Sequence, residues 1–153
     1  MAHYSDSMMQ DGKLYTFLAL TGTIPFVAGA LLPLFGVAEL PVLGALDFVA
    51  GTYGLAIICF LAGSHWGTCL SGHSVSSLNL FVISNVIFLA VWFAFIGASL
   101  EWAIGTQIIA FLVLLLVDYR LKESGVISAH YFGVRAVATL VATASLLIIL
   151  LFR

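Results

Sequence analysis

The stretch ALDFVAGTYGLAIICFLAGSHWGTCL, residues 45–70, decides the fold of this 153-residue chain. About 20 consecutive apolar residues are enough to cross the hydrocarbon core of a bilayer as an α-helix. Asp47 lies near the start of the stretch and His65 near its end, and no charged side chain lies between them. We therefore predict that residues 45–70 form a membrane-spanning helix.

Four further runs have the same apolar character, and most charged residues lie outside the five runs. The runs lack the alternation of a transmembrane β-strand, which needs only about 10 residues. The predicted fold class is therefore all-α. We expect a polytopic membrane protein whose single transmembrane domain, residues 1–153, is a bundle of five transmembrane helices. The predicted spans are residues 14–34, 45–70, 78–98, 102–121 and 131–152.

The composition excludes several classes of protein. The chain is 63% hydrophobic and 8% charged, whereas soluble domains have roughly 25% charged residues. Five Lys and Arg residues and a net charge of -2 cannot make the clustered basic face that binds nucleic acid. The histidines and cysteines show no HxxxH or CxxC spacing, so we predict no metal site. No catalytic residue and no cofactor are predicted, because the sequence contains no catalytic or nucleotide-binding motif.

The distribution of basic residues predicts the orientation. With five spans, Lys13, Arg120 and Lys122 lie on the same side as the N-terminus, and Arg135 is close to that side. The other side has only Arg153. Because cytoplasmic loops carry an excess of Lys and Arg, we predict that the N-terminus is inside and the C-terminus outside. Below, "inner" and "outer" refer to this predicted orientation.

Pro25 lies within the first predicted span. A proline in a helix removes one backbone donor and clashes with the preceding turn, so we predict a kink at Pro25. Thr21 and Thr23 are close enough to satisfy the backbone groups that such a kink frees. A packing kink accounts for this proline without a functional role.

Small residues follow one face of the 45–70 helix. Successive residues of a helix are rotated by about 100°, so Gly51 and Gly54 share a face with His65. Gly63 and Gly67, four residues apart, lie on an adjacent face. Small side chains allow helices in a membrane to approach closely. We therefore predict helix packing at these four glycines, and a tight helix contact at Gly63 and Gly67 in particular.

Three ionisable side chains are predicted to meet on the inner side. His65 lies near the inner end of the second span, Asp118 ends the fourth, and Arg135 lies about one turn into the fifth. Asn85 of the third span is a possible fourth member. Ionisable residues within a membrane are often functional. The alternatives are a structural salt bridge between Asp118 and Arg135, and a histidine that only bonds a backbone carbonyl. The outer half carries a second set of polar residues, of which Asp47 is expected to be hydrated: Asp47, Glu101, Thr106 and Gln107.

Several segments resemble an uncharacterised membrane family. They are GTIPFVAGALLP (22–33), TYGLAIICFLAGSHWG (52–67), SVSSL (74–78), the Asp after the fourth span, and YFGVR (131–135). In this order they are similar to the family of transmembrane protein 69, a domain of unknown function numbered 3429. The chain departs from the family pattern at Ser76-Ser77, where a proline is usual, and before Tyr131, where a tryptophan is usual. The resemblance implies a bacterial or mitochondrial inner membrane, and it implies no activity, substrate or cofactor.

Two functions follow as the main hypotheses. The first is a non-catalytic accessory or assembly subunit of a larger membrane complex, because the chain is small and has glycine-rich helix faces. The second is a small transporter or channel for a proton or small solute, because Asp47 and His65 lie at opposite ends of one helical face. A membrane enzyme or redox carrier has no motif in its favour. The predicted partners are the lipid bilayer and either other membrane subunits or a second copy of the chain.

Overall fold

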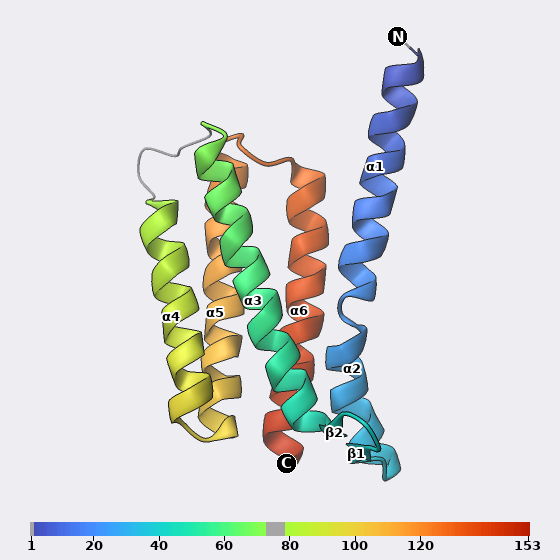
Figure 1. Ribbon diagram of the computed structural model, residues 1–153. Coiled ribbons are helices and arrows are strands. Elements are labelled where there is room, and N and C mark those ends of the chain that lie inside the picture. Colours follow the sequence, from blue (N-terminus) through green and yellow to red (C-terminus); the bar gives the residue numbers. More distant parts are fainter. Residues whose placement is uncertain (1, 73–78) are drawn as a thin grey trace.

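The protein is a bundle of long helices, shown by a computed structural model in Figure 1. The structure describes residues 2–72 and 79–153, with the side chains from residue 12 onward. The predicted start of the third span at Leu78 and the SVSSL segment lie outside the described residues. The elements are α1 (Ala2–Thr21), α2 (Ile24–Leu31), the 3-10 helix η1 (Leu32–Phe35), β1 (Glu39–Leu40), β2 (Gly44–Ala45), α3 (Leu46–Leu70), α4 (Leu80–Gly97), α5 (Leu100–Glu123) and α6 (Ala129–Phe152).

The membrane-spanning architecture agrees with the sequence. Five segments of the described chain are helical, long and apolar enough to cross a membrane. The first of them joins the end of α1 to α2 and η1, over Gly12–Phe35, and the other four are α3 to α6. Their bounds lie close to the predicted ones, and α5 extends two residues beyond the predicted span at either end, to Leu100 and Glu123. The prediction of an all-α bundle of five transmembrane helices is confirmed.

The helices meet in an arrangement with two distinct ends. The start of α1, the end of α3, the start of α4 and the α5–α6 connection share one end, which we call the N-terminal end (Figure 1). The β-hairpin, the α4–α5 connection and the end of α6 share the other, the C-terminal end. Helix α3 packs against α2, α4 and α5, whereas α6 packs against α5, α2 and α1. Toward its N-terminus, α1 leans away from the bundle (Figure 1).

The first span is broken rather than simply kinked. Helix α1 ends at Thr21 and α2 begins at Ile24, so Pro25 lies in the first turn of α2, where a missing backbone donor costs little. The Tyr53 hydroxyl donates to the carbonyl of Gly22 at 2.9 Å. Thr23 donates to the carbonyl of Leu20 at 2.7 Å. Side chains therefore satisfy backbone groups at the break, which is necessary where lipid offers no hydrogen bonds.

A short β-hairpin, which the sequence analysis did not predict, joins the first span to α3. Glu39 pairs with Ala45 and Leu40 with Gly44 in antiparallel register. Gly44 has φ 81°, a conformation that costs glycine little because it has no Cβ. The hairpin leads directly into Leu46, whose side chain is buried at the start of α3.

Aromatic rings fill the centre of the bundle. Phe26 of α2 lies edge-on to Tyr53 of α3, with ring centroids 5.2 Å apart, and to Phe111 of α5 at 5.8 Å. Gln107 is fully buried nearby and donates to the carbonyl of Gly51 at 2.8 Å. The core thus fixes α2, α3 and α5 against one another at the level where α3 carries its glycines.

Ion pairs at the C-terminal end join three helices. Arg153, after α6, lies 3.0 Å from a carboxylate oxygen of Asp47 on α3 and 3.2 Å from one of Glu101 on α5. Asp47 was expected to be hydrated, and it is indeed partly exposed, but it also has this cationic partner. Surface pairs of this kind contribute little to stability.

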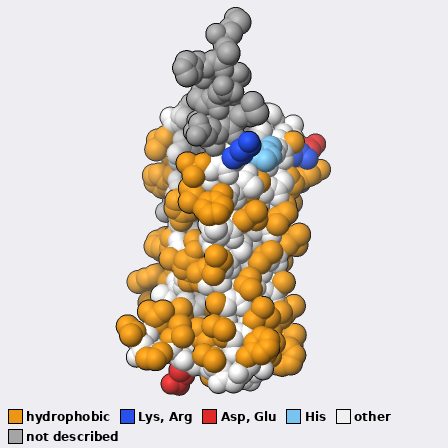
Figure 2. All heavy atoms as spheres, turned by 90° about the vertical axis from the view of Figure 1, so that its right-hand side faces the viewer, with side chains coloured by type: hydrophobic (Ala, Val, Ile, Leu, Met, Phe, Trp, Pro, Cys, Tyr) orange, Lys and Arg blue, Asp and Glu red, His pale blue; other side chains and the backbone are white. Residues whose placement is uncertain are grey.

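The outer surface of the bundle is strongly apolar. Figure 2 shows hydrophobic side chains over most of the length of one face, with basic and histidine side chains near the N-terminal end. Lys13, Arg120 and His130 are exposed there. These helices belong to an integral membrane protein, and the orientation of its termini stays a prediction.

Candidate functional site

His65 is the member of the polar cluster that α3 contributes. It lies five residues before the last residue of α3, Leu70, and only 2% of its surface is exposed. Its Nε2 atom lies 2.8 Å from Oδ1 of Asp118. The imidazole therefore faces into the bundle and does not face lipid.

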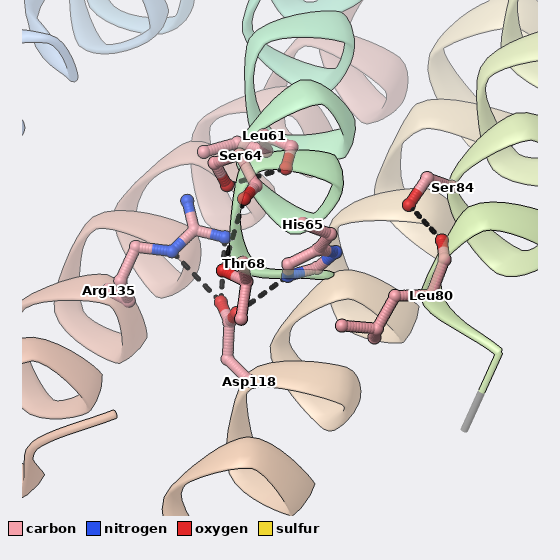
Figure 3. A network of polar contacts seen from close by, with 8 residues as sticks. All are labelled: Leu61, Ser64, His65, Thr68, Leu80, Ser84, Asp118 and Arg135. Carbon is pink, nitrogen blue, oxygen red and sulfur yellow. Dashed lines mark hydrogen bonds and ion pairs between the residues drawn. The ribbon is translucent and has the colours of Figure 1, made fainter. Parts of the chain in front are cut away.

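Asp118 bridges the other two ionisable groups. Its Oδ2 atom accepts two hydrogen bonds from Arg135, from Nε at 2.9 Å and from Nη2 at 2.7 Å, while Oδ1 faces His65 (Figure 3). Both carboxylate oxygens are thus engaged, one by a cation and one by an imidazole. Three helices, α3, α5 and α6, each supply one member of this group, which we call the inner cluster: His65, Asp118 and Arg135.

Local sequence holds α5 and α6 in the position that this contact needs. Helix α5 ends with a turn in which Gly125 has φ 72° and Val126 N–H donates to the Leu121 carbonyl at 2.9 Å. Ser128 then caps α6 by accepting from Tyr131 N–H at 3.1 Å. A tight connection with both ends capped fixes the register of the two helices, and this register sets Asp118 opposite Arg135.

Burial makes the inner cluster energetically significant. Asp118 is 2% exposed and Arg135 is 7% exposed, and an apolar group of Leu80, Val117 and Leu121 lies at the same end of the bundle. Removing one partner of a buried ion pair leaves an uncompensated charge and costs about 3–5 kcal/mol. Within the described residues the arginine and the aspartate balance each other, so the cluster is neutral while the imidazole is uncharged.

The contact with Asp118 assigns the proton of the imidazole to one nitrogen. While the carboxylate is ionised it can only accept, so the His65 Nε2 atom that faces it is then the donor. The other ring nitrogen, Nδ1, is buried and has no hydrogen-bond partner among the described residues. Figure 3 shows it on the side of the ring away from Asp118. The cluster therefore contains one buried nitrogen with unused hydrogen-bonding capacity.

Asn85, which we considered as a fourth member, lies elsewhere. Its side chain is exposed and donates to the carbonyl of Phe81 at 2.7 Å. Its neighbour Ser84 is the buried polar residue of α4 and donates to the carbonyl of Leu80. Adjacent helix residues differ in direction by about 100°, and on α4 it is Ser84 that faces the bundle while Asn85 faces outward. Ser84 was not among the site residues predicted from the sequence.

The four predicted packing glycines divide into two pairs. Gly51 and Gly54 face the interior: a Cβ on Gly51 would lie 3.1 Å from a Leu100 methyl group, and one on Gly54 would collide with the Gln107 amide. Gly63 and Gly67 face outward, and a Cβ on either would meet nothing within 4 Å among the described residues. The prediction of a tight contact at Gly63 and Gly67 is therefore wrong for packing within the chain. The helix that packs on α3 at its glycines is α5, opposite Gly51 and Gly54.

The comparison with known families settles the identity at the level of family. A family profile described as "Protein of unknown function (DUF3429)" matches residues 12–151. The chain belongs to the DUF3429 family. The narrower resemblance to transmembrane protein 69 stays a prediction. No solved structure matches this DUF3429 protein.

The DUF3429 match covers the five spans except the last residue of the fifth, and it covers every member of the inner cluster. The bundle with a buried histidine–aspartate–arginine contact is thus the architecture of the matched domain in this chain. That the inner cluster has a functional role stays a prediction, as does the membrane in which this DUF3429 protein resides.

Proposed function

We propose that this DUF3429 protein is a non-catalytic accessory or assembly subunit of a larger membrane complex. The observation that carries the proposal is a groove of about 330 Å³ on the outside of the bundle, between α3 and α4. Glycine, small side chains and two aromatic rings line it, together with Asn85: Cys59, Ala62, Gly63, Trp66, Ser84, Asn85 and Phe88. A hollow lined by glycine and small side chains accepts a helix of another subunit at close range.

Asn85 supports a protein partner rather than lipid in this groove. The residue is five positions into α4, about 7.5 Å along the helix axis, and its side chain is exposed. Its amide makes one hydrogen bond among the described residues, to Phe81, which leaves its carbonyl oxygen unused. An unpaired amide facing hydrocarbon is costly. The occupant that we propose is a transmembrane helix of another protein with a hydrogen-bond donor at the level of Asn85.

The test is purification of the tagged protein from its native membrane in mild detergent. We expect a larger complex at fixed stoichiometry, and we expect Gly63→Leu to lose it. Gly133→Leu is the matched control, because Gly133 of α6 is also an exposed helical glycine, and a Cβ added there would meet nothing within 4 Å among the described residues. A homo-oligomer as the sole species, or a complex that survives Gly63→Leu as well as Gly133→Leu, contradicts the proposal.

A second candidate function is transport of a proton or small solute, and the inner cluster is the observation that favours it. His65 Nδ1 is buried without a partner among the described residues, and imidazole side chains commonly carry protons in membrane transporters. Purified protein in vesicles that contain a pH-sensitive dye tests this function. Proton flux that His65→Asn abolishes would support transport, and vesicles no more permeable than empty ones would contradict it.

A further inference from the structure

A second hollow lies between the first span and the rest of the bundle. It has a volume of about 380 Å³ and is bounded by residues of α1, α2, α3, α5 and α6. Cavities of this size hold small ligands. It shares no lining residue with the α3–α4 groove. We call it the first-span cavity.

The first-span cavity is open to the lipid. Leu18 of α1 and Phe60 of α3 both line it, and they are 58% and 72% exposed. Deeper in, Phe26, Phe111 and Ala142 line it, and each of these is at most 2% exposed. A molecule that reaches these three residues must therefore enter sideways from the bilayer, past α1.

One end of the first-span cavity is polar. Tyr15, Tyr131 and Arg135 line it there, and the rings of the two tyrosines are stacked with centroids 5.1 Å apart. The Tyr15 hydroxyl is buried and has no partner within hydrogen-bond geometry among the described residues. Two guanidinium nitrogens of Arg135 bond Asp118, while the third points away from that carboxylate (Figure 3). This end of the first-span cavity therefore offers hydrogen-bond donors to a ligand.

Charge decides which acceptor fits these donors. The positive charge of Arg135 is already matched by Asp118 at 2.7 Å. A second anion beside the pair would have no counter-charge, and burying an unmatched charge is expensive. A neutral carbonyl can accept the same hydrogen bonds without that cost. The chemistry at this end thus favours a carbonyl group attached to a long apolar chain.

Depth in the membrane points to the source of that carbonyl. Tyr131 and Arg135 lie two and six residues after the start of α6, which is about 3 Å and about 9 Å along the helix. The interfacial layer of a bilayer is about 5–7 Å thick on each side of the hydrocarbon core. Ester carbonyls of glycerolipids lie in this layer, with their acyl chains pointing toward the bilayer centre, as the cavity does from Tyr131 toward Phe111.

We propose that the first-span cavity binds one ester-linked acyl chain of a membrane glycerolipid. The ester carbonyl accepts hydrogen bonds at the Tyr15–Arg135 end, and the chain packs along Phe26, Phe111 and Ala142. The lipid so held fills the space between α1 and the other helices. The inference is independent of the proposed accessory function, because the two surfaces have no residue in common.

A phospholipid with a photoactivatable diazirine in its acyl chain tests the site in reconstituted protein. We expect cross-links on Phe26, Phe111 and Ala142, located by peptide mass spectrometry, and we expect excess unlabelled phospholipid to prevent them. Ala138→Phe fills the cavity and should reduce these cross-links at least tenfold. Val137→Phe is the matched control, because the Val137 side chain is 50% exposed and lies outside the cavity. The fold of each variant is checked by its circular dichroism spectrum.

A second pair of variants tests the same cavity if Ala138→Phe does not fold. Ala19→Phe enters the cavity from α1, and Leu20→Phe, on the exposed side of the same helix, is its control. Tyr15→Phe should weaken competition by unlabelled phospholipid about fivefold, the effect of one hydrogen bond, without moving the cross-linked positions. Cross-links that Ala138→Phe and Ala19→Phe leave unchanged would overturn the proposal. It would also be overturned if a fatty acid or a quinone displaced the probe and a glycerolipid did not.

Discussion

Asp118 and Arg135, seventeen residues apart in the chain, are joined by two hydrogen bonds of 2.9 and 2.7 Å inside the bundle. The contact crosses from α5 to α6 and leaves the second oxygen of Asp118 for His65 at 2.8 Å. One carboxylate thus links three helices at a position that is almost inaccessible to solvent. Because all three partners are buried, each one can be tested by its effect on stability.

Removing the carboxylate should strongly destabilise the protein. We expect Asp118→Ala to lower the free energy of unfolding by about 3–5 kcal/mol, because the Arg135 guanidinium is left buried without a counter-charge. The double variant Asp118→Ala with Arg135→Ala should lose less than the sum of the two single variants. Denaturant unfolding in detergent micelles measures all three. Additive losses would show that the two side chains do not interact in solution.

Removing the imidazole should have a smaller effect. His65→Ala leaves one oxygen of Asp118 without its hydrogen bond, while the two hydrogen bonds from Arg135 to Asp118 remain. The expected loss is about 1–3 kcal/mol, the cost of one unsatisfied buried group. Thr68→Ala is a suitable control, because Thr68 is on the same turn of α3 and its hydroxyl, among the described residues, bonds only the carbonyl of Ser64. Equal losses in both variants would argue against a specific role of His65 in stability.

Replacing a glycine of α3 by alanine should change the stability of the protein differently at Gly54 and at Gly63. Gly54→Ala pushes a Cβ into the buried Gln107 amide, so we expect a loss of about 1–3 kcal/mol from overpacking. Gly63→Ala meets nothing within 4 Å among the described residues, and it should be neutral or slightly stabilising, since alanine favours helix over glycine by about 1 kcal/mol. Thermal unfolding of the two variants side by side measures the difference. A Gly63→Ala variant that is as unstable as Gly54→Ala would require a different packing of α3.

The orientation can be tested with reporter fusions. Lys13, Arg120 and Lys122 lie near the N-terminal end of the bundle, and Arg153 lies at the opposite end. The positive-inside rule then places the N-terminal end in the cytoplasm or its equivalent. A reporter fused after Gly72 should therefore read inside, and one fused after Glu101 should read outside. The reverse pair of signals would refute the orientation and leave the bundle itself unaffected.

The sequence was sufficient for those features that depend on single segments. Lipid as the solvent requires long apolar runs, so the spans could be located from hydropathy alone. The convergence of His65, Asp118 and Arg135 followed from the order of the spans, because each residue lies near the same end of its helix. The break before Pro25 was predicted as a kink, but not the hydrogen bond that the Gly22 carbonyl accepts there from the Tyr53 hydroxyl, which comes from α3.

Features that depend on the rotation of a helix against its neighbours could not be predicted. A stripe of small residues shows that another helix can approach closely. Where one helix has two such stripes, the sequence does not show which of them is in contact. On α3 the bundle uses Gly51 and Gly54 and leaves Gly63 and Gly67 outside. In the same way, a difference of one position decides that Ser84 is buried and Asn85 exposed. The pairing of Gln107 with the Gly51 carbonyl requires contact between two spans that are distant in sequence.

Asp118, near the end of α5, is synthesised before Arg135, the cation that pairs with it. A chain made from its N-terminus exposes Asp118 and His65 to the insertion machinery before Arg135 has been synthesised. Until α6 arrives, the carboxylate lacks the cation that pairs with it in the folded bundle, Arg135. The short α5–α6 connection, Ser124 to Ser128, brings the arginine within reach almost at once. We therefore expect helices α5 and α6 to enter the bilayer together, as one hairpin in which the ion pair of Asp118 and Arg135 has already formed.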